Sequence, residues 1–132
     1  RLEHPLLKTL SVKWTNAQVQ QVAIICPRLN QLKIVLNNVD SLRVECPDLY
    51  LLDARIDVLS QCVIVAPKLY SCKCSLEALP LGALSNVRSL SLHKISWNTQ
   101  YAGLNHLETL VLKEIVFDVL VLDIPRLTRL KL

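Results

Sequence analysis

Histidines and cysteines are the residues of this 132-residue chain whose side chains could bind a metal or act in catalysis. The three histidines, His4, His93 and His106, never stand at the i, i+4 spacing with which one helix offers two imidazoles to zinc. No Ser, Cys or Asp forms a recognisable nucleophile motif with any of them. We therefore expect solvated or loop histidines and predict that the chain is not an enzyme.

The five cysteines are an odd number at spacings unlike any disulfide framework, which predicts a reducing compartment, the cytoplasm or the nucleus. Cys72-x-Cys74, together with Cys62, could imitate a thiolate metal site. All three, however, fall at repeat positions otherwise filled by Leu, Ile, Val or Ala, so we expect core thiols, no metal and no cofactor. Cys26 and Cys46 occupy equivalent positions in successive repeats, so a disulfide between them is sterically conceivable but not expected.

The overall composition favours a packed single domain. Hydrophobic residues make up 52% of the chain and charged residues 20%, which argues against disorder, and no apolar run approaches the roughly 18 residues of a membrane span. Two glycines are too few for a dinucleotide fingerprint and wrongly spaced for a phosphate-binding loop. The net charge of +4 suits an acidic partner surface, but with so modest a charge and so few aromatic residues we do not expect a nucleic acid as partner. Because no apolar run is long enough to span a membrane, we expect no membrane partner either.

A repeated motif, L-x-x-L-x-L, organises the whole chain. Its leading residue occurs at positions 7, 29, 49, 69, 87, 107 and 127, which gives steps of 22, 20, 20, 18, 20 and 20 residues. All 21 positions of the three apolar columns hold an apolar residue or Cys. A register chosen at 52% apolar composition does not produce this by chance, so the period is real.

Further apolar columns precede the motif. Seven and five residues before the leading position stand apolar pairs: Val22 and Ile24, Leu42 and Val44, Cys62 and Ile64, and later Leu120 and Leu122. Alternating apolar residues just before a proline predict a short strand that ends there. Ten residues before the leading position lies a third column: Val19, Val39, Leu59, Trp97 and Phe117. Residues 80–104 depart from this pattern, and we expect an irregular segment with a short helical turn around residues 97–103.

Because one repeat cannot bury its hydrophobic edge alone, successive repeats must stack. We predict a single strand-rich, right-handed solenoid spanning residues 1–132, with a parallel main sheet and about seven short coils of about 20 residues. The predicted strands are residues 7–12, 29–34, 49–54, 69–74, 87–92, 107–112 and 127–132. The first and last motifs reach the ends of the sequence without a polar cap, so we expect an excerpt of a longer solenoid.

The motif, its period and the Cys-Pro or Ala-Pro corners resemble leucine-rich repeats (LRRs), more specifically the short, irregular repeats of plant-type F-box/LRR proteins. Residues 26–32, 64–69 and 107–117 carry the resemblance, which covers essentially the whole chain. It implies an α/β-type repeat solenoid that recognises protein substrates for an SCF-type ubiquitin ligase. The Asn that follows an LRR strand and ties its turn appears in register only as Asn37, with Asp57 as a substitute.

The F-box itself would precede this sequence, so a Skp-type adaptor is an expected partner only if an F-box lies upstream. The alternative function is a structural or scaffolding LRR protein in a larger assembly, with no ubiquitin role. The residues upstream of Arg1 would separate these two hypotheses.

The residues between the leucines are expected to point outward from the main sheet. With the leading residue as column one, columns two, three, five, seven and eight should form one surface, which leans basic and carries two tyrosines side by side. The candidate partner-binding residues are Lys33, Tyr50, Asp53, Arg55, Tyr70, Lys73, His93 and Lys113. They would favour a protein partner with an acidic or C-terminal carboxylate segment. The alternative, that they are an ordinary solenoid surface of mixed charge, stays open.

Overall fold

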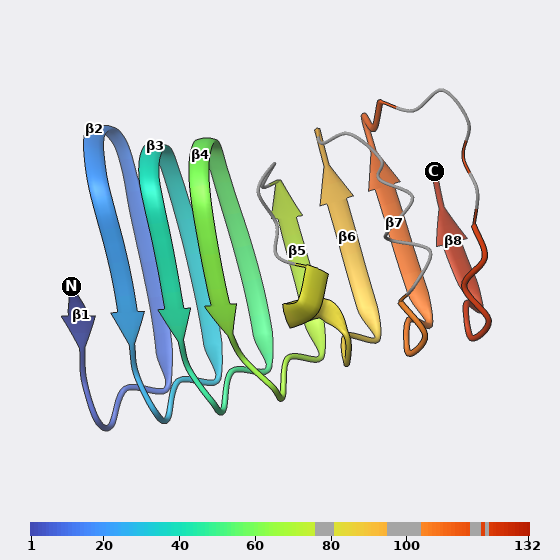
Figure 1. Cartoon of the computed structure of the whole chain (residues 1–132), viewed down its shortest axis with the longest axis horizontal. Coiled ribbons are helices and arrows are strands. Elements are labelled where there is room, and N and C mark those ends of the chain that lie inside the picture. Colours follow the sequence, from blue (N-terminus) through green and yellow to red (C-terminus); the bar gives the residue numbers. More distant parts are fainter. Residues whose placement is uncertain (76–80, 95–103, 117–119, 121) are drawn as a thin grey trace.

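The computed structural model of the chain describes residues 1–75, 81–94, 104–116, 120 and 122–132. Its strands pair in sequence order, every neighbouring pair parallel, so the described residues form a strand-rich parallel-sheet solenoid (Figure 1). The strands are β1 (Leu2–Glu3), β2 (Thr9–Ile25), β3 (Gln31–Glu45), β4 (Leu51–Val65), β5 (Ser71–Ser75), β6 (Ser89–His93), β7 (Thr109–Lys113) and β8 (Arg129–Lys131).

Strands β2, β3 and β4 each bend midway, so that each has two limbs running in opposite directions (Figure 1). The first limbs, residues 9–14, 31–36 and 51–56, continue through β5 to β8 as one row of parallel strands, the first layer. The second limbs, residues 18–25, 38–45 and 58–65, pair with one another and with β1 as the second layer.

The strand register reproduces the spacing of the sequence motif. Thr9 pairs with Gln31 at a step of 22 residues, and Ser71 pairs with Ser89 at a step of 18. The other first-layer pairs have a step of 20. Between Trp14 and the second limb of β2 the step changes from 22 to 20, so the extra two residues are accommodated at the bend. Equal columns therefore stack directly on one another.

A backbone turn repeats before each first-layer strand from β3 to β8. The N–H of the leading residue donates to the carbonyl three positions earlier, as from Leu29 to Cys26 at 3.2 Å and from Leu49 to Cys46 at 3.0 Å. Four of these turns carry proline at the second position, where its fixed φ suits a β-turn: Pro27, Pro47, Pro67 and Pro125. The carbonyl residues of these turns are buried.

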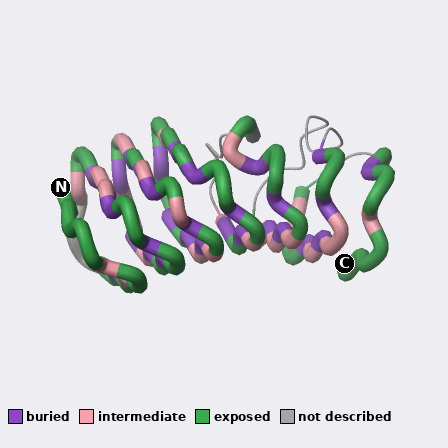
Figure 2. The backbone as a smooth tube through the Cα atoms, turned by 90° about the horizontal axis from the view of Figure 1, so that it is seen from below, coloured by how far each residue is buried: buried purple, intermediate pink, exposed green. Residues whose placement is uncertain are grey.

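The apolar columns meet in one core between the two layers, and buried and exposed positions alternate along the strands (Figure 2). Leu52 and Leu110, from the first layer, are 2% and 0% exposed, and Ala54 and Cys74 are buried beside them. Val44 and Ile64 face them from the second layer. The prediction that the inward columns form the core is confirmed for the coils from β3 to β7.

The first-layer strands begin two residues later than predicted. The leading residue belongs to the corner turn, and the next two N–H groups both donate to one carbonyl: those of Tyr50 and Leu51, for example, donate to the Asn30 oxygen at 2.8 and 3.0 Å. Regular ladder pairing starts only at column three. The pairing of Leu2 and Glu3 with the second layer was not predicted, although Leu2 stands five residues before Leu7, as Ile24 does before Leu29.

Two sequence-based assignments need correction. Column eight was expected to face outward, but Leu36 and Ile56 are each only 2% exposed, because inside–outside alternation continues to the end of each first limb. The α/β class is not what the described residues show: they include a 3₁₀ helix at Leu81–Leu84 and no α-helix. The helical turn expected at 97–103 lies outside the described residues, and so do parts of several coils, so the count of seven coils stays a prediction. No helix in the described part is both long and apolar enough to cross a membrane.

Candidate partner-binding surface

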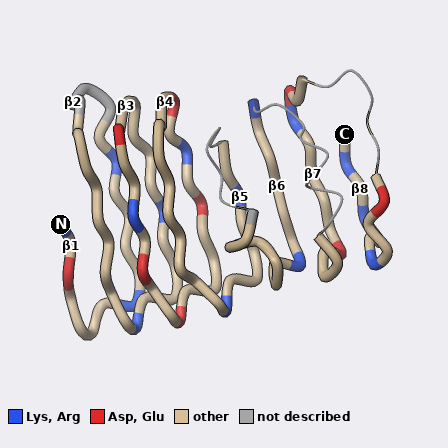
Figure 3. The backbone as a smooth tube through the Cα atoms, viewed as in Figure 1, with Lys and Arg blue, Asp and Glu red and all other residues tan. Residues whose placement is uncertain are grey.

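The outward side of the first layer holds all eight residues that the sequence singled out. They stand in three columns. Column two contributes Tyr50 and Tyr70; column five contributes Lys33, Asp53 and Lys73; column seven contributes Arg55, His93 and Lys113. Basic and acidic residues are interspersed along the described part of the solenoid (Figure 3). Ring stacking, a groove and a small cavity distinguish three parts of this outward side.

Tyr50 and Tyr70 stack face to face, with ring centroids 5.0 Å apart and planes 9° apart. The backbone brings them together: the Tyr50 carbonyl accepts hydrogen bonds from the N–H groups of Tyr70 and Ser71, at 3.0 and 3.1 Å. The rings are exposed, Tyr50 by 48% and Tyr70 by 37%. The prediction that two tyrosines one coil apart form one aromatic surface is confirmed.

Arg88 and Glu108 extend this stack over two further coils. The Arg88 guanidinium carbon lies 5.9 Å from the centroid of the Tyr70 ring, at the distance of a cation–π contact. Its Nη1 lies 3.7 Å from Glu108 Oε1. Sequence reasoning did not pair these residues, although all four stand in column two. We call Tyr50, Tyr70, Arg88 and Glu108 the column-two ladder.

A shallow groove of about 530 Å³ crosses the outward side of β2 to β5. Its lining includes the outward residues of columns three and five: Thr9, Ser11, Gln31, Lys33, Leu51, Asp53, Ser71 and Lys73. Asp53 stands between Lys33 and Lys73 in the strand register. Its Oδ1 is buried, makes no hydrogen bond, and lies 3.7 Å from Arg55 Nε. The groove therefore combines charged side chains in column five with the outward, partly buried Leu51 in column three.

A second, smaller cavity of about 240 Å³ lies where β4 to β7 present columns five and seven. Its lining includes Arg55, Lys73, His93 and Lys113, the hydroxyl residues Ser75 and Ser91, and Cys74 beneath them. None of the described Asp and Glu residues lines it. Two carboxylates of the described part stand at its rim: Asp53 beside Arg55, and Glu114, whose Oε2 lies 3.5 Å from His93 Nε2. We call this cavity the basic pocket; sequence reasoning named its cations but not their convergence.

Left-handed residues end the strands that bound the basic pocket. Lys94 and Glu114 follow β6 and β7 directly and have φ of 56° and 51°, in the region that side chains rarely adopt. The Lys94 N–H donates to the Lys113 carbonyl at 3.1 Å. At the equivalent positions of β3 and β4, Leu36 and Ile56 continue the strand. In β6 and β7, the regular strand pairing of the first layer thus ends directly after His93 and Lys113.

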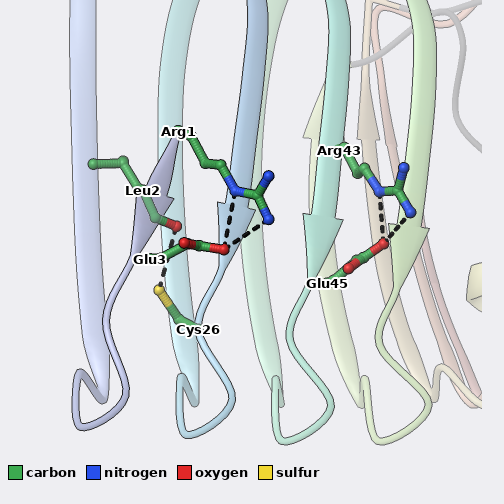
Figure 4. Close-up of polar contacts among 6 residues, drawn as sticks. All are labelled: Arg1, Leu2, Glu3, Cys26, Arg43 and Glu45. Carbon is green, nitrogen blue, oxygen red and sulfur yellow. Dashed lines mark hydrogen bonds and ion pairs between the residues drawn. The ribbon is translucent and has the colours of Figure 1, made fainter.

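The second layer carries exposed ion pairs. Arg1 Nε donates to Glu3 Oε1 at 2.9 Å, and Arg43 Nε donates to Glu45 Oε1 at 2.6 Å, at equivalent places two coils apart (Figure 4). Exposed pairs of this kind contribute about 1 kcal/mol or less each. Figure 4 also shows the Cys26 thiol directed at the Leu2 carbonyl, with Sγ and O 3.9 Å apart.

All five cysteines are free thiols in the structure, four of them buried. Cys72 Sγ and Cys74 Sγ lie 3.7 Å apart inside β5. The hydrogen bond with Cys72, together with burial, raises the pKa of Cys74 well above its usual value, and burial raises the pKa of Cys62 to about 11. These thiols stay protonated at neutral pH and pack as small hydrophobic groups. Among the described residues no group of three or more His, Cys, Asp or Glu side chains is placed to hold a metal ion.

Comparison with known proteins identifies no relative: no family model, curated protein or solved structure matches this chain.

Proposed function

We propose that this chain is a protein-interaction module that binds its partner on the outward side of the first layer. The observation that carries the proposal is the column-two ladder, in which two exposed, stacked tyrosines are held in place by the backbone beneath them. Tyr and Arg are enriched in interface hot spots, and Tyr buries a large area at a small cost in side-chain entropy. Repeat solenoids bind partners along such extended surfaces.

The test compares two double variants of the chain in quantitative pull-downs from cell extract. Tyr50→Ala/Tyr70→Ala removes the exposed rings, whereas Val63→Ala/Val65→Ala removes exposed apolar groups of β4 from the second layer. A specific partner should lose at least about tenfold in affinity with the tyrosine variant, since a truncated aromatic anchor costs about 2 kcal/mol. The valine variant should bind the same partner with the affinity of the unaltered chain. Partners that bind both variants like the unaltered chain would contradict the proposal.

The finer proposal is that the chain is the substrate-recognition LRR region of an F-box protein in an SCF-type ubiquitin ligase. The L-x-x-L-x-L motif, its period and the proline corners support it, and the parallel stacking of the repeat is compatible with it. The mechanism would be non-covalent docking, which brings lysines of the bound protein near a ligase assembled elsewhere. A cytoplasmic or nuclear location belongs to the same proposal.

Affinity purification of the natural protein separates this function from its alternative, a scaffolding LRR protein without a ubiquitin role. Recovery of a Skp-type adaptor and a cullin in stoichiometric amounts supports the ligase function. Recovery of a stable assembly that lacks both supports the scaffolding function.

A further inference from the structure

The described lining of the basic pocket differs from neighbouring parts of the first-layer surface because it contains several cations and no carboxylate. Lys33, Asp53 and Lys73 alternate in sign along column five, and the column-two ladder ends in an Arg–Glu pair. The described residues that line the pocket, by contrast, include the cations Arg55, Lys73 and Lys113 and no carboxylate, although Asp53 and Glu114 at the rim lie near Arg55 and His93. Lys73 and Lys113 form no ion pair with any described residue.

The lining comes from four successive strands, which hold its side chains in a defined arrangement. Arg55 is in β4, Lys73 and Ser75 are in β5, and His93 pairs with Lys113 across β6 and β7. Neighbouring parallel strands are about 4.8 Å apart. Arg55 and Lys113 come from the two outer strands of this set, and the hydroxyl residues Ser75 and Ser91 come from the two strands between them. Cationic nitrogens and hydroxyls are the donors that bind tetrahedral oxyanions.

We propose that the basic pocket binds the phosphate of a phosphoserine or phosphothreonine in the partner protein. A phosphomonoester carries about −1.5 to −2 charges at neutral pH and three acceptor oxygens, which matches several cations and two serine hydroxyls. Because Lys73 and Lys113 form no ion pair with any described residue, two positive charges are available to a doubly charged phosphate, whereas a carboxylate would compensate only one of them. The proposal rests on the proposed function, because it assigns the chemistry of the partner on the same surface.

The neighbouring groove fits the rest of the partner segment. The groove and the basic pocket adjoin at Lys73, and together their linings extend from β2 to β7 across the strands. Five strand spacings make a track of about 24 Å, which an extended segment of about seven residues spans. The segment would place its phosphate among Arg55, His93 and Lys113 and its apolar residues over the groove beside Leu51.

Short degenerate peptide pools test this assignment with the full chain. The pools are identical except for a central phosphoserine, serine or glutamate, and binding is measured by fluorescence anisotropy. We expect the phosphoserine pool to bind and the serine pool to bind at least about tenfold more weakly, since serine lacks the charge-assisted hydrogen bonds of the phosphate. Equal binding of the phosphoserine and serine pools would overturn the proposal.

Matched lysine variants locate the binding. Lys113→Ala removes a cation of the pocket, whereas Lys13→Ala removes an exposed lysine from the same column in β2, outside the pocket. Phosphoserine binding should fall about tenfold with the first variant and stay unchanged with the second. Lys73→Gln gives the same comparison if Lys113→Ala fails to fold, as judged by circular dichroism. Equal losses in the Lys113→Ala and Lys13→Ala variants would mean that only the overall charge attracts the peptide, and the proposal would fail.

Two further measurements separate the proposal from its competitors. Tighter binding of a single-stranded oligonucleotide than of the phosphoserine pool would assign the pocket to nucleic acid and overturn the phosphoprotein assignment. Phosphatase treatment of a partner recovered in the pull-down should abolish its binding. A partner that still binds after this treatment, but requires Tyr50 and Tyr70, would refute the pocket assignment while leaving the proposed interaction surface intact.

Discussion

Tyr50 and Tyr70 lie one coil apart with parallel rings, because the backbone hydrogen bonds between their coils set the separation of 5.0 Å between ring centroids. The solenoid therefore determines which side chains touch: residues of one column meet when they belong to neighbouring coils, although 18 to 22 residues separate them in sequence. The same rule brings Arg88 over the Tyr70 ring and Glu108 beside Arg88. A functional surface on such a fold is best considered column by column.

The tyrosine stack should contribute measurably to stability. A double-mutant cycle with Tyr50→Ala and Tyr70→Ala should give a coupling energy of about 1 kcal/mol in urea unfolding, the value typical of aromatic pairs. Tyr70→Ala should cost more than Tyr50→Ala, because it also removes the cation–π contact with Arg88. A control cycle that combines Tyr50→Ala with Lys113→Ala should give a coupling energy near zero. Equal coupling in both cycles would show that the rings do not interact in solution.

Burial in the core predicts very different effects for neighbouring residues of β7. Leu110 is fully buried, so Leu110→Ala should lower the free energy of unfolding by about 2–5 kcal/mol through lost burial and a cavity. Val111 faces outward and is half-buried, so Val111→Ala should cost clearly less. Chemical denaturation of both variants gives the comparison. Similar losses at the two positions would contradict the inside–outside assignment of the strand.

The period of the sequence predicted the register because parallel in-register stacking places equal columns together, even where the step is 22 or 18 residues. The burial of the inward columns was predictable for the same reason. The burial of column eight could not be predicted from the period, because the place where a strand bends depends on how both layers pack. Leu36 and Ile56 still belong to the first limb, and their side chains are buried.

The candidate site was predicted in its residues but not in its geometry. Column membership identified Tyr50 and Tyr70 as neighbours and named the cations of the basic pocket. Their convergence on one cavity depends on side-chain directions and on where β6 and β7 end. Lys94 and Glu114 end them with positive φ, and neither residue type announces that conformation in a sequence, as glycine or asparagine would.

The left-handed backbone at Lys94 predicts a stabilising substitution. Glycine adopts a φ of 56° without the steric cost that lysine has there, so Lys94→Gly should raise the free energy of unfolding by about 1 kcal/mol. The ion pair that is lost, with Lys94 Nζ 3.9 Å from Glu114, is exposed and contributes little. Lys113→Gly, within strand β7, is the matched control and should destabilise the chain. Destabilisation by Lys94→Gly would contradict the positive φ.

Raised thiol pKa values predict a loss of stability in alkali. The folded chain holds the proton of Cys62 up to a pKa of about 11, whereas the unfolded chain releases it at lower pH. Between these two pKa values the unfolded state binds fewer protons than the folded state. The contribution of Cys62 to stability is therefore complete below the pKa of the unfolded state and is lost as the pH rises through the pKa of the folded state. Urea unfolding measured from pH 8 to pH 11 should show the decline (roughly the range between the usual thiol pKa and the raised one). Cys62→Val, which matches Val22 in the same column, should make the decline shallower; an unchanged profile would show that Cys62 is not the cause.

The last strand predicts self-association of this 132-residue polypeptide. Among the described residues β8 pairs with β7 on one side only, and Leu130 and Leu132 are 44% and 74% exposed. An unprotected strand edge with apolar side chains favours pairing with a second chain. Light scattering should therefore show a mass that rises with concentration, and Leu130→Lys/Leu132→Lys should reduce that rise, since charged residues on an edge oppose pairing. Lys substitutions at Val63 and Val65, exposed on the second layer away from β8, control for the added charge and should have the smaller effect. A polypeptide that stays monomeric at high concentration would show that the edge of β8 is protected.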